Sequence, residues 1–443
     1  MEFKNLYTNK KENIIIKNGL IINPTLNEPY KSDILISNGI ITEIKENLFE
    51  KDNIKNNFDN FILIEAKDLF VCPGFIDMHV HLREPGNEYE EDIDSGTKSA
   101  LRGGITSIAC MPNTNPVIDC EHLVKYIKLR SQEVGYNIYP VAAITKNLQG
   151  EIINDLKTLK NEGAIAFSDD GKCIQNARLM YEVMRYCAEF NALLILHEED
   201  YGFSNNGVMH EGYYSTLLGL DGISSLSEDL MISRDILLAK ITGARIHITH
   251  VSSARAIKMI EIAKNEGVKV TCDTTSEHLF FNDSFIQDYN TNFKIKPPIR
   301  SEEDRIAIIS GLKNGVIDAI ASDHAPHLSI EKDISFNEAS FGSIGMETLF
   351  KASLSKLYFE ENFPIQKIIS LISFNPSNIL NIENTNIEKG KIANISIVDI
   401  NTENTYKIKD IVSKSKNSTF LNQNLKGEIK YTIVNGKLMF INE

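Results

Sequence analysis

The sequence predicts an α/β protein in which a (β/α)8 barrel carries a small β-sandwich domain built from both chain termini. Two observations lead to this fold class. The middle of the chain alternates short β-branched runs with helix-length amphipathic stretches, which is typical of β/α units around a parallel sheet. The two ends instead carry short alternating runs separated by hairpin turn residues. With 443 residues, the chain is long enough for both parts.

The β-sandwich is predicted from residues 1–72 and 381–443. The first part contains the strand-like runs IIIKNGLIIN, DILISNGIITEI and FILIEAKDLFVCPG, with Asn-Gly turn signals at 18–19 and 38–39. The second part contains ANISIVDI and EIKYTIVNGKLMFIN, with the same turn signal at 435–436. Because both ends share one hairpin pattern, we expect them to assemble into one domain.

The barrel is predicted over residues 73–380. Its eight strand candidates are GFIDMHV, ITSIACM, NIYPVAAI, GAIAFS, ALLILH, RIHITHV, VKVTCD and IDAIAS. Helix candidates between them include HLVKYIKLRSQEVG and EIINDLKTLKNEG, which end at a Gly suited to a helix C-terminus. An open doubly wound sheet is the alternative, but about 300 residues with eight units favour a closed barrel.

Composition excludes several classes of protein. Hydrophobic residues make up 42% and charged residues 24%, which excludes collagen-like and disordered chains. The net charge of −14, without a basic patch, argues against a nucleic-acid or anionic-membrane surface. The sequence has no run near the roughly 20 apolar residues of a membrane span and no secretory signal, so we expect a cytoplasmic protein. The six cysteines form no C-x-x-C pair and are expected to be reduced.

Polar residues follow most of the predicted strands. In a barrel of this kind the chemistry lies at the carboxyl ends of the strands, where these residues would meet at one mouth. They are His79 and His81 after the first strand, Asn113 after the second, Asp169 and Asp170 after the fourth, His197 after the fifth, His250 after the sixth and Asp323 after the eighth.

The histidines indicate a metal site. Alternation along a strand points His79 and His81 to the same face, where two neutral imidazoles can bind one ion. An isolated H-x-H pair can arise by chance, and a lone strand-end histidine is more often a hydrogen-bonded core residue. Because His197 and His250 also end apolar runs, a metal site is favoured over chance or hydrogen-bonded core histidines. Four histidines exceed the three ligands of a usual catalytic zinc, so we expect two ions.

Carboxylates and one cation complete the predicted site. The pair Asp169–Asp170 can supply a bridging carboxylate, although a solvated turn before Gly171 is the alternative. Asp323 can contact a metal and move a proton. Arg83 offers a planar fork for a substrate carboxylate, or else forms a surface salt bridge. Asn113 is a second substrate contact, or else belongs to a turn.

One further segment near the predicted mouth shows no clear period. Residues 328–340, LSIEKDISFNEAS, are predicted to form a mobile loop beside the site. An ordinary surface excursion is the alternative.

Several motifs together resemble those of dihydroorotases of the amidohydrolase superfamily, bacterial class I type, over essentially the whole chain. The motifs are PGFIDMHVHLREPG at 73–86, MPNTNP at 111–116, FSDDG at 167–171, LHEE at 196–199, ITHVSS at 248–253, KPPIR at 296–300, ASDHAPH at 321–327 and FGSIGMET at 341–348. Their order and spacing are highly specific.

The resemblance implies two zinc ions per chain and a role for each motif residue. His79 and His81 would bind the first zinc, His197 and His250 the second, and Asp170 would bridge them. Asp323 would be the catalytic acid/base and a ligand of the first zinc. The implied substrate contacts are His81, Arg83, Asn113, Lys296, His327 and the backbone of Phe341 and Gly342.

The implied reaction is the reversible interconversion of N-carbamoyl-L-aspartate and L-dihydroorotate in pyrimidine synthesis. A zinc-activated hydroxide would attack the ring amide carbonyl, and Asp323 would pass the proton to the departing nitrogen. The implied partner is this small anionic substrate. The resemblance also admits a homodimer and an association with aspartate transcarbamoylase.

Two positions depart from the family pattern. Lys296 stands where many members have Asn, which adds a charge near the substrate. Glu277, beside His278, stands where a second His is common, and we expect it to affect packing more than catalysis.

Two rival functions stay open on the sequence. An allantoinase or hydantoinase would use the same barrel, but those relatives bridge their metals with a carboxylated lysine where this chain has Asp170. A metal-poor structural partner of aspartate transcarbamoylase would lose ligands, whereas every expected ligand is present here.

Overall fold

The structure is a computed structural model that describes residues 1–4, 6–7, 12–24, 26, 28–48, 61–383 and 386–442. Eight parallel strands form the predicted barrel. Their order is β16-β15-β14-β11-β10-β9-β8-β7, and β7 and β16 approach each other through a parallel bridge between Val80 and His324. The strands are β7 (Phe75–Val80), β8 (Ile105–Cys110), β9 (Asn137–Ala142), β10 (Ala166–Phe167), β11 (Leu193–Leu196), β14 (Arg245–Ile248), β15 (Val270–Thr275) and β16 (Ala319–Ala321).

All eight coincide with the strand candidates read from the sequence, so the predicted barrel is confirmed.

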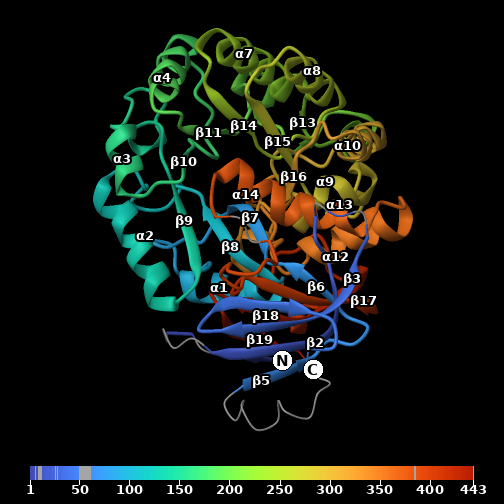
Figure 1. Cartoon of the computed structure of the whole chain (residues 1–443). Coiled ribbons are helices and arrows are strands. Elements are labelled where there is room, and N and C mark those ends of the chain that lie inside the picture. The colour runs from blue at the N-terminus through green and yellow to red at the C-terminus, as the bar shows by residue number, and fades with distance from the viewer. Residues whose placement is uncertain are drawn as a thin grey trace.

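Helices cover the outside of the barrel, as Figure 1 shows. The longer ones are α1 (Ile93–Arg102), α2 (Glu121–Val134), α3 (Leu156–Glu162), α4 (Ala177–Glu189), α7 (Leu226–Thr242), α8 (Ala254–Asn265) and α10 (Glu302–Asn314). Helix α1 begins at Asp92, whose side chain accepts the Ser95 N–H. Helices α2 and α3 end at Gly135 and Gly163, whose φ values of 69° and 116° confirm the predicted glycine ends.

Shorter elements fill the loops at the barrel mouth and the return to the C-terminal strands. They are α5 (Tyr201–Ser204), β12 (Met209–His210), α6 (Tyr213–Leu218), β13 (Gly222–Ile223), α9 (Ser276–Phe280), α11 (Ser329–Lys332), α12 (Leu349–Ser353), α13 (Ile365–Ile369) and α14 (Asn375–Leu380). Wider helical turns over Leu354–Glu360 and Ser370–Phe374 join the last three helices.

A second sheet combines strands from both ends of the chain, as predicted. Its order is β1-β19-β18-β17-β6-β2-β3-β4, with β5 beside β2. The two ends meet where β6 pairs with β2 in parallel and with β17 in antiparallel fashion. Figure 1 shows this sheet below the barrel, with both termini beside it. The strands are β1 (Glu2–Phe3), β2 (Asn13–Ile21), β3 (Tyr30–Ser37), β4 (Ile40–Lys45), β5 (Phe61–Glu65), β6 (Phe70–Pro73), β17 (Ile395–Thr405), β18 (Asn424–Val434) and β19 (Lys437–Ile441).

The domain boundaries 1–72, 73–380 and 381–443 remain a prediction. Five of the six cysteines are buried, Cys120 is exposed, and all six are free thiols. None of the helices in the described part of the chain is long and apolar enough to cross a bilayer.

The hairpin turns from the two ends pack against each other. Gly436 has a φ of 73°, and a Cβ built on it would lie 2.0 Å from the Gly39 Cα. Gly436→Ala therefore combines left-handed strain with a backbone clash and is expected to lower Tm. Gly390→Ala is the control for strain alone, since Gly390 has a φ of 89° and open space around it. Equal changes in Tm for the two variants would show that the contact between the turns is not tight.

Candidate active site

Six polar side chains meet at the carboxyl ends of the barrel strands. His79 and His81 come from the end of β7, and the other four follow β10, β11, β14 and β16: Asp170, His197, His250 and Asp323. Among the described residues, these side chains form two potential metal-binding groups, His79–His81–Asp170 and Asp170–His197–His250, each with donor atoms within 4.8 Å of one another. The structure thus brings together every residue that the sequence proposed as a metal ligand.

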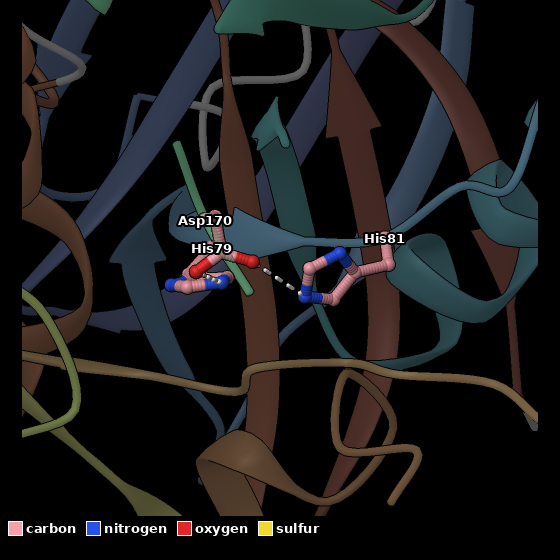
Figure 2. A group of neighbouring side chains, drawn as sticks. All are labelled: His79, His81 and Asp170. Atoms are coloured by element: carbon pink, nitrogen blue, oxygen red, sulfur yellow. Dashed lines mark ion pairs between the residues drawn. The ribbon is translucent and has the colours of Figure 1, made fainter. Parts of the chain in front are cut away.

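The first group is held on both sides by carboxylates. Asp170 Oδ1 lies 3.3 Å from His79 Nε2, and Asp170 Oδ2 lies 3.5 Å from His81 Nε2. Figure 2 shows both imidazoles turned towards this carboxylate. Asp323 Oδ1 lies 3.5 Å from His79 Nε2 and 3.1 Å from His81 Nε2. Separations of this size are those expected of ligand atoms about 2.1 Å from a shared ion.

The second group uses the same aspartate. His197 Nδ1 lies 3.0 Å from His250 Nε2 and 3.8 Å from Asp170 Oδ1. Asp170 is therefore the residue common to both groups. Its neighbour Asp169 is directed elsewhere, because Asp169 Oδ1 accepts the backbone N–H groups of Ile144 and Thr145 at 2.8 and 2.9 Å. The structure separates the roles of the two adjacent carboxylates.

Hydrogen bonds behind the histidines fix which nitrogen faces inward. His79 Nδ1 donates to Thr249 Oγ1 at 2.8 Å, and His81 Nδ1 donates to Asn113 Oδ1 at 2.8 Å. His197 Nε2 donates to Glu199 Oε2 at 3.3 Å. In the neutral form of each ring, this bond leaves the opposite nitrogen as a lone-pair donor facing the cluster.

The electrostatics of the cluster fit a bound cation. Burial lowers the pKa of His79, but Asp170 and Asp323 outweigh it and raise that pKa to about 10. Burial and then His197 lower the pKa of His250 to about 3, so its imidazole is neutral. Moreover, His79 Nε2 and Asp170 Oδ1 are buried and form no hydrogen bond with any part of the chain that the structure describes. An ion bound by imidazole and carboxylate would satisfy these atoms, and that donor set suits Zn²⁺.

Three of the predicted site residues, Arg83 among them, adopt a backbone conformation that is uncommon outside glycine. The φ values are 60° for Arg83, 42° for His250 and 45° for Asp323. Backbone strain of this kind concentrates at functional sites, where the surrounding structure holds it in place.

The predicted substrate residues lie around the metal groups with partners of their own. Arg83 Nε donates to Pro326 O at 3.1 Å and lies 2.9 Å from Glu90 Oε2 in an ion pair, and these two contacts hold its guanidinium in place. His327 Nε2 lies 3.4 Å from Arg83 Nη2 and donates to Phe341 O at 2.8 Å. Asn113, proposed as a substrate contact, has its carbonyl oxygen committed to His81.

Lys296 is paired with a carboxylate. Its Nζ lies 2.8 Å from Glu199 Oε1 and 4.8 Å from the centre of the Phe341 ring. Because the other Glu199 oxygen accepts from His197, Lys296 is linked to the second metal group through one side chain. Lys296 thus has a carboxylate counter-ion beside the second metal group.

Glu199, Glu90 and Thr249 are site residues that the sequence reasoning did not single out. Glu199 carried a signal, because it follows His197 by two positions within LHEE. Glu90 and Thr249 act through other side chains, and nothing in their local sequence indicates this.

The sequence of the chain matches known proteins over nearly its whole length. A family model described as Dihydro-orotase-like matches residues 69–256. A dihydroorotase of Acetivibrio thermocellus is 42% identical over 96% of this chain and 98% of its own length. A dihydroorotase of Caldicellulosiruptor saccharolyticus is 44% identical over the same shares of the two chains. The chain belongs to the dihydroorotase family.

Solved structures of other cyclic amidohydrolases share the fold of this dihydroorotase-family chain. An L-hydantoinase from Arthrobacter aurescens superposes with a TM-score of 0.85 at 21% identity, covering 98% of each chain. A D-hydantoinase superposes with a TM-score of 0.82 at 22% identity, covering 96% of this chain and 95% of its own. These neighbours support the barrel with its β-sandwich domain.

Glu199 offers a test of the second metal group that is independent of turnover. The Glu199 carboxylate orients His197 and raises the basicity of its imidazole. Glu199→Gln removes this carboxylate, so we expect metal affinity to fall by about 10- to 100-fold. Glu198→Gln is the matched control, because Glu198 Oε2 accepts from Cys173 Sγ at 4.0 Å and its side chain does not contact His197 through a hydrogen bond in the described chain. Competition with a metal chelator measures both affinities. Equal metal affinities of the two variants would show that Glu199 does not support the second metal group.

Proposed function

We propose that this protein is a dihydroorotase, which closes N-carbamoyl-L-aspartate to L-dihydroorotate with loss of water in pyrimidine biosynthesis. The observation that carries the proposal is the pair of histidine groups joined by Asp170, in a chain 42–44% identical to relatives named dihydroorotase. The hydantoinase neighbours, at 21–22% identity, support the fold alone.

The chain's own residues would hold two zinc ions. His79, His81 and Asp323 would bind the first, His197 and His250 the second, and Asp170 would bind both. Bound zinc supplies Lewis-acid polarisation of the amide carbonyl and lowers the pKa of a water molecule towards about 7.

Asp323 is the proposed proton carrier. Burial raises its pKa, but the imidazoles of His79 and His81 outweigh this and hold the pKa below its ordinary value. Asp323 is therefore a carboxylate at neutral pH and can act as a base. Its side chain is 21% exposed, in contrast to the 5% of Asp170, so it is the more accessible of the two carboxylates. In ring opening it takes the proton of the attacking water and delivers it to the departing ring nitrogen, and in ring closure it reverses the transfer.

Arg83 is the proposed anchor of the substrate carboxylate. The chain carries a net charge of −14, which repels an anionic substrate, so the site needs a local cation. The contacts of Arg83 with Glu90 and Pro326 are at Nε, so the terminal N–H groups of the guanidinium keep donors for a carboxylate. We assign the remaining contacts to His81, Asn113, Lys296, His327, Phe341 and Gly342.

Ring opening of three substrates tests the proposed function. Purified protein with two equivalents of zinc is assayed on L-dihydroorotate, allantoin and hydantoin under one set of conditions. We expect a higher kcat/KM for L-dihydroorotate than for the other two. Faster opening of allantoin or hydantoin would overturn the proposal, and a zinc-free protein that gains no zinc on reconstitution would favour a scaffold role.

The expected location, oligomeric state and partner protein remain predictions. They are a cytoplasmic location, a homodimer, and an association with aspartate transcarbamoylase. Sedimentation of the protein alone and with that partner measures the last two.

A further inference from the structure

The backbone at Phe341 and Gly342 is held by side chains from other parts of the chain. The carbonyl of Phe341 accepts from His327 Nε2 at 2.8 Å. The carbonyl of Gly342 accepts from Lys332 Nζ at 3.0 Å and from Asn417 Nδ2 at 3.1 Å. Because both carbonyls are bonded to side chains, this short segment does not depend on a regular secondary structure for its position.

Gly342 also has a conformation that other residues would not maintain. Its φ is 146°, and a Cβ at this position would lie 2.9 Å from atoms of Ala325. Its N–H donates to Lys294 O at 2.9 Å. The Phe341 N–H is left as the one backbone polar group of the pair without a hydrogen-bond partner in the described ranges.

Lys332, at the end of α11, carries a buried amino group surrounded by carbonyl groups. Its Nζ donates to Ser340 O at 2.7 Å, Gly342 O at 3.0 Å and Lys294 O at 3.4 Å, which matches the three protons of an ammonium group. The residue is 5% exposed, and no carboxylate in the described chain lies within 4.0 Å of this ammonium. Burial, and then the charge of Lys294, lower the pKa of Lys332 to about 7. The three carbonyls are the acceptors that stabilise its ammonium form, so this form favours their present positions.

Asn417 connects the C-terminal part of the chain to the same segment. Its Oδ1 accepts the His327 N–H at 3.0 Å, while its Nδ2 donates to Ala325 O at 3.0 Å and Gly342 O at 3.1 Å. One amide thus ties the loop after β16 to the backbone of Gly342.

We propose that Lys332 and Asn417 are positioning residues that fix His327 and the Phe341–Gly342 backbone for binding of the substrate ring. The inference rests on the proposed function, since that function places a cyclic amide beside this segment. The ligand chemistry that fits is a ring carbonyl, which can accept the unused Phe341 N–H. We name these two side chains the Gly342 clamp.

Lys332→Met tests the clamp, because it keeps an unbranched side chain one atom shorter than that of lysine and removes all three N–H donors. We expect the KM for L-dihydroorotate to rise about tenfold, equivalent to the loss of one ordinary hydrogen bond, while kcat and zinc content stay near those of the wild type. Amide hydrogen exchange over 340–344 is expected to be faster. Asn417→Ala is the second variant and is expected to give the same pattern if Lys332→Met does not fold.

Lys416→Met is the matched control. Lys416 Nζ also donates to two carbonyls, Ile411 O at 2.8 Å and Ser413 O at 2.6 Å, but it does not bind the Gly342 segment. We expect its KM and its exchange over 340–344 to match the wild type.

The outcomes separate the clamp from the proposed function. Unchanged exchange over 340–344 in both folded clamp variants would overturn the clamp. Faster exchange with an unchanged KM would overturn its role in substrate binding. A wild-type protein that does not turn over L-dihydroorotate would overturn the proposed function, and the exchange comparison with Lys416→Met would still decide whether the clamp exists.

Discussion

Asp323→Asn is expected to lower kcat for L-dihydroorotate by about 10²- to 10⁴-fold, the range typical of a lost general acid or base. The amide has the shape of the carboxyl group but cannot carry the proton between water and ring nitrogen. His79, His81 and Asp170 still surround the first metal position, so most of the zinc is expected to remain. Turnover assays and metal analysis on the same sample measure both effects.

The backbone conformation at Asp323 allows this substitution to change proton transfer without changing the fold. Its φ of 45° is a conformation that Asn adopts more readily than most residues, so folding is expected to be preserved. Glu277→Gln is the control. Burial raises the pKa of Glu277 to about 8, so this neighbour is largely protonated at neutral pH and a neutral amide replaces it closely. Turnover near the wild-type rate in Asp323→Asn would remove Asp323 from the mechanism.

Asp170→Asn is expected to reduce bound zinc from about two ions per chain to less than one and to abolish turnover. The reason is that Asp170 belongs to both histidine groups, His79–His81–Asp170 and Asp170–His197–His250, so one substitution weakens both. Loss of a carboxylate also leaves the imidazoles without the anion that balances two divalent cations. Metal analysis after gel filtration measures the zinc content.

Asp169→Asn is the matched control for Asp170→Asn. The two residues are adjacent and both buried, but Asp169 binds the backbone of Ile144 and Thr145. We expect Asp169→Asn to lower Tm and to keep both zinc ions. If Asp170→Asn retained two zinc ions per chain, the bridging role would be wrong.

The barrel and most of its polar mouth could be predicted because strand alternation is a local property. The H-x-H pattern places His79 and His81 on one face, and each of His197 and His250 closes an apolar run that becomes a strand. Spacing alone did not distinguish Asp169 from Asp170, since both follow the same short strand. The backbone N–H groups that bind Asp169 come from a loop about 25 positions earlier in the sequence.

The rest of the site depends on contacts between distant positions. Asn417 lies 90 residues from His327, and the C-terminal sequence has no feature that indicates the contact. The excursion over 201–223, with α5, α6, β12 and β13, was not predicted either, because its elements are too short to show a period. The prediction for segment 328–340 did not include a helix, whereas the structure places α11 (Ser329–Lys332) at its start and ties it to the Gly342 backbone through Lys332. The mobility of this segment stays a prediction.

Titration of zinc into metal-free protein, with ring opening of L-dihydroorotate as the readout, tests the two-metal dihydroorotase site most directly. We predict that activity rises with added zinc and reaches its maximum at two ions per chain. Full activity at one ion per chain, or two bound ions with no turnover of L-dihydroorotate, would contradict the account.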